Sequence, residues 1–160
     1  MRFLLRTFVI ASLGLLALSL GAGRASAQQR DPVAALTKLL RDDNVDVRRA
    51  AAKALTRMPH TEAAVPALVA ALKDEDPFVR DNAVDALCSM PPAEVVPGLI
   101  RALKDPNQNS RRRGAEALMR LGHYVEDAIP DLILLLKDEH EEVREAATAA
   151  LRRILVGRWD

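Results

Sequence analysis

A sequence repeat that occurs four times in a row constrains this chain more than any other feature. Leucines at nearly even spacing mark the copies: Leu40, Leu72, Leu103 and Leu136. An aspartate follows each leucine by two residues, an arginine follows it by eight, and an Ala-Leu pair ends fifteen residues after it. A period on the order of 30 residues is typical of stacked repeat architectures. We therefore place the copies at about residues 32–58, 64–90, 95–121 and 128–154.

Each copy has the pattern of two short helices joined by a turn. The first helix is expected to begin near a proline, because the missing N–H of proline costs nothing at a helix start. Three copies have a proline there, Pro66, Pro97 and Pro130, and the first copy has Ala34. The second helix carries one apolar stripe at helical spacing, for example Val79, Ala83, Ala86, Leu87 and Met90. No window shows sustained strand alternation. The sequence predicts an all-α fold, an α-solenoid of about four helical hairpins.

The motif V-R-x-x-A-x-x-A-L, as in residues 79–87, recurs in the second helix. It resembles the HEAT repeat, and in particular the HEAT-like repeats of phycobilisome lyases, over residues 31–154. The resemblance implies that the recurring aspartate and arginine form a structural ladder between helix ends, a contact that a forked guanidinium suits. Copy three departs from the pattern, with Ser110 in place of valine and Gly114 inside the second helix.

Residues 1–27 have the pattern of a secretory signal peptide. Two arginines precede an uncharged apolar stretch, and an A-x-A cleavage site, Ala25-Ser26-Ala27, stands before Gln28. The alternative is a retained membrane anchor, because the uncharged run at residues 7–23 is at the short limit for crossing a bilayer. We predict cleavage, a mature chain that begins at Gln28, a periplasmic or extracellular location, and no stable membrane insertion after cleavage.

The composition of the mature chain argues against a nucleic-acid partner. Removal of the three leader arginines from the 23 basic residues leaves 20 against 22 acidic residues, a net charge of about −2, whereas a nucleic-acid binder needs a basic surface. Only Phe78, Tyr124 and Trp159 remain as aromatic residues, too few for a base-stacking platform. Cys88 is the only cysteine, so no internal disulfide can form. We expect Trp159 to cover the end of the last repeat.

The histidines do not form a metal-binding pattern. His60 and His123 occupy the same position in copies one and three, so helix packing at 8–10 Å puts them roughly 18–20 Å apart, too far to share an ion. His140-Glu141 lies in the turn of copy four, whereas HEAT-repeat di-iron hydroxylases carry their His-Glu pairs after the repeat arginine. No nucleophile elbow or phosphate-binding loop occurs. We predict no catalytic residue, no cofactor and no metal site.

Four small or apolar residues on the second helices of copies two and three suggest a docking strip for another protein. Val84 and Cys88 lie four residues apart on one helix, and Ala115 and Met119 lie four apart on the next. They fall outside the predicted core stripe, so we expect them to be exposed, with Asp81 and Arg112 at the rim. An exposed apolar patch of this kind marks a contact site.

The function that follows is an exported protein-protein interaction module or scaffold without catalytic activity. Two alternatives stay open. One is a lyase-like or chaperone subunit of an enzyme complex, which the repeat variant suggests and the leader argues against, because such lyases act on cytosolic pigment proteins. The other is a structural spacer that forms homo-oligomers.

Overall fold

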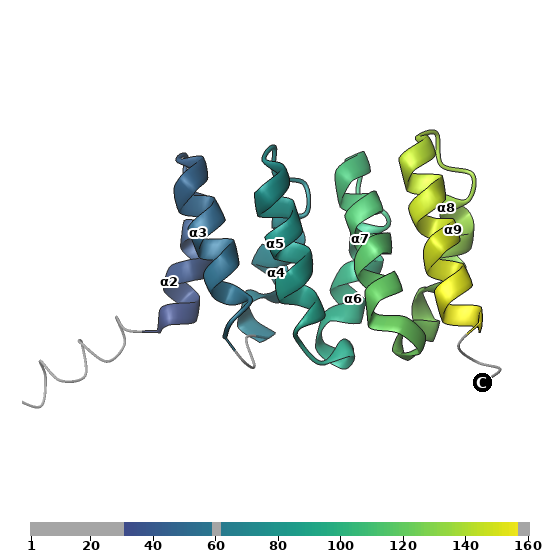
Figure 1. The fold of residues 1–160 in the computed structure, drawn as a ribbon, viewed down its shortest axis with the longest axis horizontal. Helices are drawn as coiled ribbons and strands as arrows, with labels where there is room; N and C mark the ends of the chain where they lie inside the picture. The colour runs from purple at the N-terminus through teal and green to yellow at the C-terminus, as the bar shows by residue number, and fades with distance from the viewer. Residues whose placement is uncertain (1–30, 59–61, 157–160) are drawn as a thin grey trace, which may run out of the picture.

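The computed structural model describes residues 31–58 and 62–156, and over these residues the chain is helical without a strand. The predicted all-α solenoid is confirmed (Figure 1). The α-helices, in chain order, are α2 (Pro32–Leu39), α3 (Val45–Leu55), α4 (Val65–Ala71), α5 (Pro77–Cys88), α6 (Pro92–Ala102), α7 (Gln108–Leu121), α8 (Ile129–Leu135) and α9 (Glu141–Val156). Two 3-10 helices, η1 (Glu62–Ala64) and η2 (Gly122–Ala128), precede α4 and α8.

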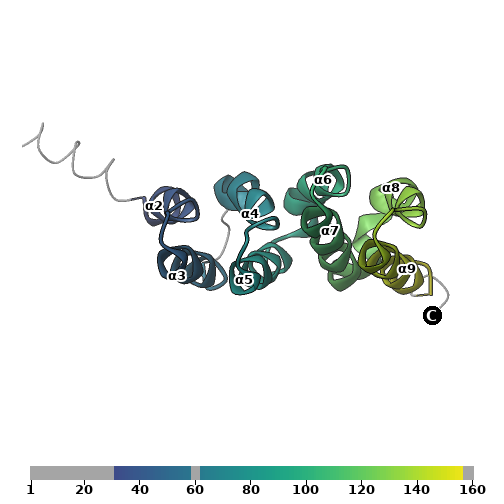
Figure 2. The same ribbon diagram turned by 90° about the horizontal axis from the view of Figure 1, so that it is seen from above.

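The helices form two layers, which Figure 2 shows from above. The first helices of the four copies, α2, α4, α6 and α8, make one layer, and the second helices, α3, α5, α7 and α9, make the other. Within the second layer each helix packs against the next one, α3 on α5, α5 on α7 and α7 on α9. Each copy therefore contacts only its neighbours, as in other solenoids.

Three of the second helices, α3, α5 and α7, begin where a short polar side chain caps them. Asn44 accepts a hydrogen bond from the N–H of Asp46, Asp76 accepts one from Val79, and Asn107 accepts from Asn109. Such caps satisfy N–H groups that have no partner inside the helix. These caps explain why the second helices begin a few residues before the apolar stripe.

Copy three differs from the expected pattern at the start of its first helix. Helix α6 opens at Pro92, so Pro97 lies inside the helix instead of at its start. Gly114 on α7 lets α6 and α7 approach closely, because a Cβ atom there would stand 3.2 Å from the Cβ of Ala102. Gly122 ends α7 with a φ of 73°, a conformation that a residue with a side chain rarely adopts.

The buried aliphatic side chains form one continuous core. The leucines of the Ala-Leu pairs, Leu55, Leu87, Leu118 and Leu151, are all buried. The predicted apolar stripe of copy two is buried as well, namely Val79, Ala83, Ala86, Leu87 and Met90. Burial of such side chains stabilises each by roughly 1.5–3 kcal/mol.

Several sequence predictions fall outside the described residues. The predicted signal peptide, His60 and Trp159 lie there, and so does the retained-anchor alternative. In residues 31–58 and 62–156, no helix is both long enough and apolar enough to cross a membrane.

Candidate functional site

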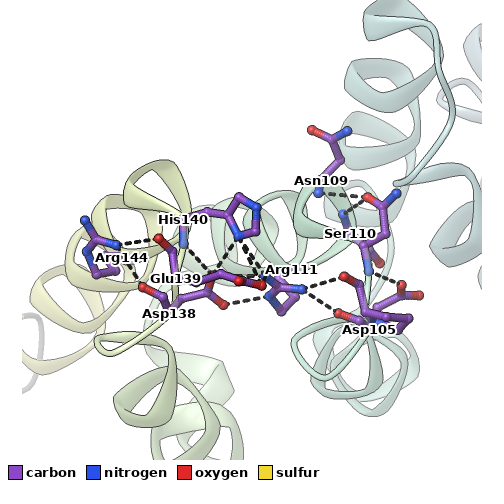
Figure 3. Close-up of polar contacts among 10 residues, drawn as sticks. Asp105, Asn109, Ser110, Arg111, Asp138, Glu139, His140 and Arg144 are labelled. Atoms are coloured by element: carbon purple, nitrogen blue, oxygen red, sulfur yellow. Dashed lines mark hydrogen bonds and ion pairs between the residues drawn. The ribbon is translucent and has the colours of Figure 1, made fainter.

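The recurring arginine and aspartate form the predicted ladder at the junction of copies three and four (Figure 3). The Nε and Nη2 atoms of Arg111 donate to the two carboxylate oxygens of Asp138, at 2.7 and 3.0 Å. Nη1 of Arg111 donates to the carbonyls of Asp105 and Pro106 in its own copy, both at 2.9 Å. One guanidinium therefore binds two carbonyls of its own loop and the carboxylate of the next copy. We call this two-sided contact a rung.

The same rung connects copies one and two. Arg48 donates to both carboxylate oxygens of Asp74, at 2.8 and 3.1 Å, and to the carbonyls of Asp42 and Asp43. The Asp74 side chain raises the pKa of Arg48, and the Arg111 guanidinium lowers the pKa of Asp138 to about 2. Arg48 and Asp138 therefore stay charged near neutral pH, and each rung is an ion pair between neighbouring copies.

The central junction, between copies two and three, lacks a rung. Nη1 of Arg80 still donates to the carbonyls of Asp74 and Glu75. Its Nε is buried without a hydrogen-bond partner, and the Asp105 carboxylate accepts from Lys73 at 3.2 Å instead. Two other ion pairs cross this junction, Arg113 with Asp81 at 2.7 Å and Arg120 with Asp85 at 2.6 Å.

The predicted docking strip is not a surface, because its two central residues are buried. Val84 is 3% exposed and Ala115 is fully buried. The equivalent residue is also buried in copy one (Ala52), but Thr148 in copy four is exposed. The side chain at this repeat position faces the next repeat, so it is exposed only in the last copy. The apolar stripe of a second helix indicates which residues face the first helix of the same hairpin and does not indicate which residues face the next hairpin.

The other two strip residues are half-buried in the same junctions. The thiol of Cys88 lies 3.7 Å from the carbonyl oxygen of Ala117 on α7. Burial raises the pKa of this thiol, which keeps it in the unreactive protonated form. Met119 packs against the core from α7. Neither side chain offers the free apolar surface that the strip required.

The charged rim of the predicted strip does lie at the surface. Asp81 on α5 is exposed and pairs with Arg113, while Arg112 on α7 is half-buried beside Glu116 at 3.9 Å. The first pair joins α7 to α5, and the second lies within α7, so both rim charges have a partner of opposite sign.

Sequence reasoning missed an aromatic contact on the outer side of the second layer. Phe78 on α5 is 62% exposed, and the guanidinium carbon of Arg49 on α3 stands 5.1 Å from its ring centroid. The carboxylate of Asp76 holds Arg49, with Nε 3.0 Å from the nearer oxygen, and this contact lowers the pKa of Asp76 to about 2. The signal was available, because Phe78 is the one apolar residue in a column otherwise made of Asp46, Asn109 and Glu142.

His140 belongs to the rung of Arg111. Its Nδ1 lies 3.3 Å from Nη2 of Arg111 and 3.4 Å from a carboxylate oxygen of Asp138 (Figure 3). The position of His140 is that of the capping residues Asn44, Asp76 and Asn107 in the other copies. Within the described residues no three His, Cys, Asp or Glu side chains form a group that could hold a metal ion.

A family model describing HEAT repeats matches residues 6–88 and 65–152, which together cover most of the chain. The chain belongs to the HEAT-repeat family, and the predicted resemblance is confirmed. The first match begins within the predicted leader. A search of curated proteins finds no match.

Solved structures share the fold. One, from work on the specificity of TOG–tubulin binding, has 18% identity and a TM-score of 0.66, covering 78% of this chain and 56% of that one. Another, the complex of CpcE and CpcF of phycocyanin lyase from Nostoc sp. PCC7120, has 21% identity and a TM-score of 0.58, covering 78% of each chain. The chain thus spans less than two thirds of the TOG structure, and it spans 63% of an engineered protein at 25% identity and a TM-score of 0.49. At identities this low the likeness to the TOG and CpcE–CpcF structures concerns the fold alone.

Proposed function

We propose that this protein is an exported HEAT-repeat module that binds another protein and catalyses no reaction. The binding surface in this proposal is the outer side of the second layer, centred on Phe78 and Arg49, with Asp81 and Arg112 at its edge. We call it the Phe78 face.

The observation that carries the proposal is the exposure of Phe78 under the guanidinium of Arg49. An exposed phenylalanine is not needed by the core, and aromatic and arginine side chains contribute most of the binding energy in many protein interfaces. Asp76 fixes Arg49 in place, so little side-chain entropy would be lost when a partner covers the pair. The partner that fits is a protein with an apolar pocket bordered by a carboxylate or carbonyl oxygen.

The test compares two exposed aromatic residues on different parts of the molecule. Proteins captured from the exported fraction by the wild-type chain are identified by mass spectrometry, and the affinity of each is then measured for variants. Phe78→Ala should weaken binding by about 30-fold, the equivalent of roughly 2 kcal/mol for a central contact. Tyr124→Ala removes an exposed ring from η2 and serves as the control. Equal affinities of all three proteins would refute the Phe78 face.

Export of the protein can be tested independently of partner binding. Its support is the A-x-A site before Gln28 and the apolar stretch that precedes it. N-terminal sequencing of protein from the periplasm or the medium should begin at Gln28. Protein that retains residue 1 in a membrane fraction would overturn the assignment.

A lyase-like or chaperone subunit is the second candidate. It is favoured by the similarity to the CpcE–CpcF complex, which extends over 78% of both chains. The predicted leader argues against it, because the pigment proteins of such lyases are cytosolic. Absorbance and fluorescence of the purified protein, before and after incubation with a bilin, would separate the two: a stable chromophore adduct supports the lyase-like function.

A further inference from the structure

The two ends of the solenoid each carry one half of a rung. At the last copy, Nη1 of Arg144 donates to the carbonyls of Asp138 and Glu139, as Arg111 does in its own loop. In the described part of the chain, Arg144 makes only these Nη1 contacts, whereas Arg48 and Arg111 also bind a carboxylate of the next copy. At the first copy, a carboxylate oxygen of Asp42 accepts from the N–H of Asn44, as Asp138 accepts from His140, and no arginine of the described residues pairs with it there.

Each end of the solenoid also exposes a leucine whose equivalents in the other copies are buried. On α2, Leu39 is 38% exposed, whereas Ala71, Ala102 and Leu135 at the same position of later copies are buried. Directly after α8, Leu136 is 40% exposed, whereas Leu40, Leu72 and Leu103 at the same position of earlier copies are buried. Each exposed leucine occupies a position that a neighbouring repeat covers everywhere else in the molecule.

The contact between α4 and α6 shows which residues of a first-layer helix face the next copy and which face the preceding copy. A Cβ on Gly98 of α6 would stand 3.1 Å from Val69 and 3.3 Å from Val65 of α4. The position of Val69 is that of Ile133 in the last copy, which is 51% exposed. The position of Gly98 is that of Ala35 in the first copy, a small exposed residue. Ile133 and Leu136 thus form the trailing surface, and Ala35 and Leu39 form the leading one.

We propose that the trailing end of one chain docks on the leading end of a second copy, head to tail, with Arg144 gripping Asp42 of the second copy. The charges are complementary, and the docking would continue the repeat spacing of the internal junctions. Such a heterologous contact does not close on itself in a straight solenoid, so it gives open-ended oligomers. This contact involves the two ends of the molecule and is independent of the Phe78 face.

The second layer makes this contact weaker than the internal junctions. Thr148 and Arg152 stand where the inner copies have small or apolar residues such as Val84 and Met119. Polar residues at an end repeat protect it from uncontrolled association. We therefore expect association that depends on protein concentration, with exchange between free and joined chains.

The test uses charge exchange in protein purified from the exported fraction, followed by sedimentation velocity over a range of concentrations. Wild-type protein should shift from one chain to two or more as concentration rises. Arg144→Glu and Asp42→Arg should each weaken self-association by about tenfold or more, the loss expected from one charged rung. An equimolar mixture of the two variants should associate again, because each supplies the charge that the other lacks.

Two further variants separate docking from folding. Ile133→Arg changes an exposed side chain on the trailing surface and should also abolish self-association, with the melting temperature unchanged. Arg153→Glu changes an exposed arginine of α9 outside the rung and should leave association intact. Protein that stays monomeric at all concentrations would overturn the proposal. So would oligomers that persist in Ile133→Arg, or an end covered by residues 1–30 or 157–160 of the same chain in a crosslinking experiment.

Discussion

The outer junctions of the solenoid and its central junction are built from the same repeated residues but are held differently. At the first and third junctions an arginine fork grips the aspartate of the next copy, Arg48 on Asp74 and Arg111 on Asp138. At the central junction Arg80 does not reach Asp105, and the ion pairs Arg113–Asp81 and Arg120–Asp85 connect α7 to α5 instead. Both Arg80 and Arg113 there keep a buried Nε without a partner.

This difference separates the local half of the arginine motif from the half that crosses between copies. In all four copies the arginine donates to two carbonyls of its own loop, because those atoms are five and six residues away in the chain. The contact with the next aspartate depends on how two hairpins sit against each other. At the central junction Lys73 occupies the Asp105 carboxylate. The repeated motif therefore determines the contacts of the arginine within its own loop. It does not determine whether the arginine binds the aspartate of the next copy.

The largest expected effect comes from placing a charge inside the central junction. Val84→Glu buries a carboxylate between α5 and α7 and should destabilise the fold by at least about 3 kcal/mol, because an unpaired charge away from water is costly. Thr148→Glu changes the same column in the last copy, where the side chain is exposed, and should stay within about 0.5 kcal/mol. Urea unfolding followed by circular dichroism measures both. Equal effects would mean that the central junction is loosely packed.

A smaller effect distinguishes an arginine with a rung from one without. Arg111→Lys loses the fork to Asp138 and should cost about 1–2 kcal/mol, since lysine cannot make the bidentate contact. Arg80→Lys loses only part of its loop contacts and should cost under about 1 kcal/mol. Thermal unfolding of the two variants gives the comparison directly. A larger loss for Arg80→Lys would show that the loop contacts, and not the fork, carry the stability.

The rung at the third junction should also make stability depend on pH in the acid range. The pKa of Asp138 is lowered to about 2 in the folded protein, below its ordinary value of about 4. A carboxyl with a depressed pKa stabilises the fold fully above its unfolded pKa, and this stabilisation is lost as the pH falls from about 4 towards 2. Asp138→Asn should therefore be less stable than wild type at pH 7, by a margin that shrinks below pH 4. A margin that stays constant from pH 7 to 2 would contradict the ionic rung.

The smallest expected effect concerns the histidine that only the third junction has. His140 contacts Arg111 and Asp138, and Glu141 follows it at the start of α9. We expect purified protein to carry no stoichiometric iron or zinc, measured by elemental analysis, and His140→Ala to leave the metal content unchanged. About one metal ion per chain that disappears in His140→Ala or Glu141→Ala would overturn this expectation and would make the junction a metal site.

The predicted ladder is present at the first and third junctions and missing at the central one, whereas the centre of the predicted docking strip is buried, and the two outcomes have different physical causes. The arginine and aspartate columns are polar residues at fixed positions near helix ends, so their contacts could be expected from the family resemblance. Val84 and Ala115 lie off the stripe that faces the partner helix of the same hairpin, and this made them candidates for exposure. A solenoid helix also has a side that faces the next repeat, and their burial belongs to that side.

The sequence by itself determined the period, the two helices of each copy and the buried leucines of the Ala-Leu pairs, because these depend mainly on contacts within a single copy of the repeat. Only the tertiary structure decided which arginine reaches the next copy and which repeat positions are buried between neighbouring hairpins. It also decided that Phe78 is exposed beside Arg49. Those features depend on the angle and spacing at which neighbouring hairpins pack. That packing is set by many side chains together, such as Gly114 and Lys73 in the third and second copies, and no single column of the repeat records it.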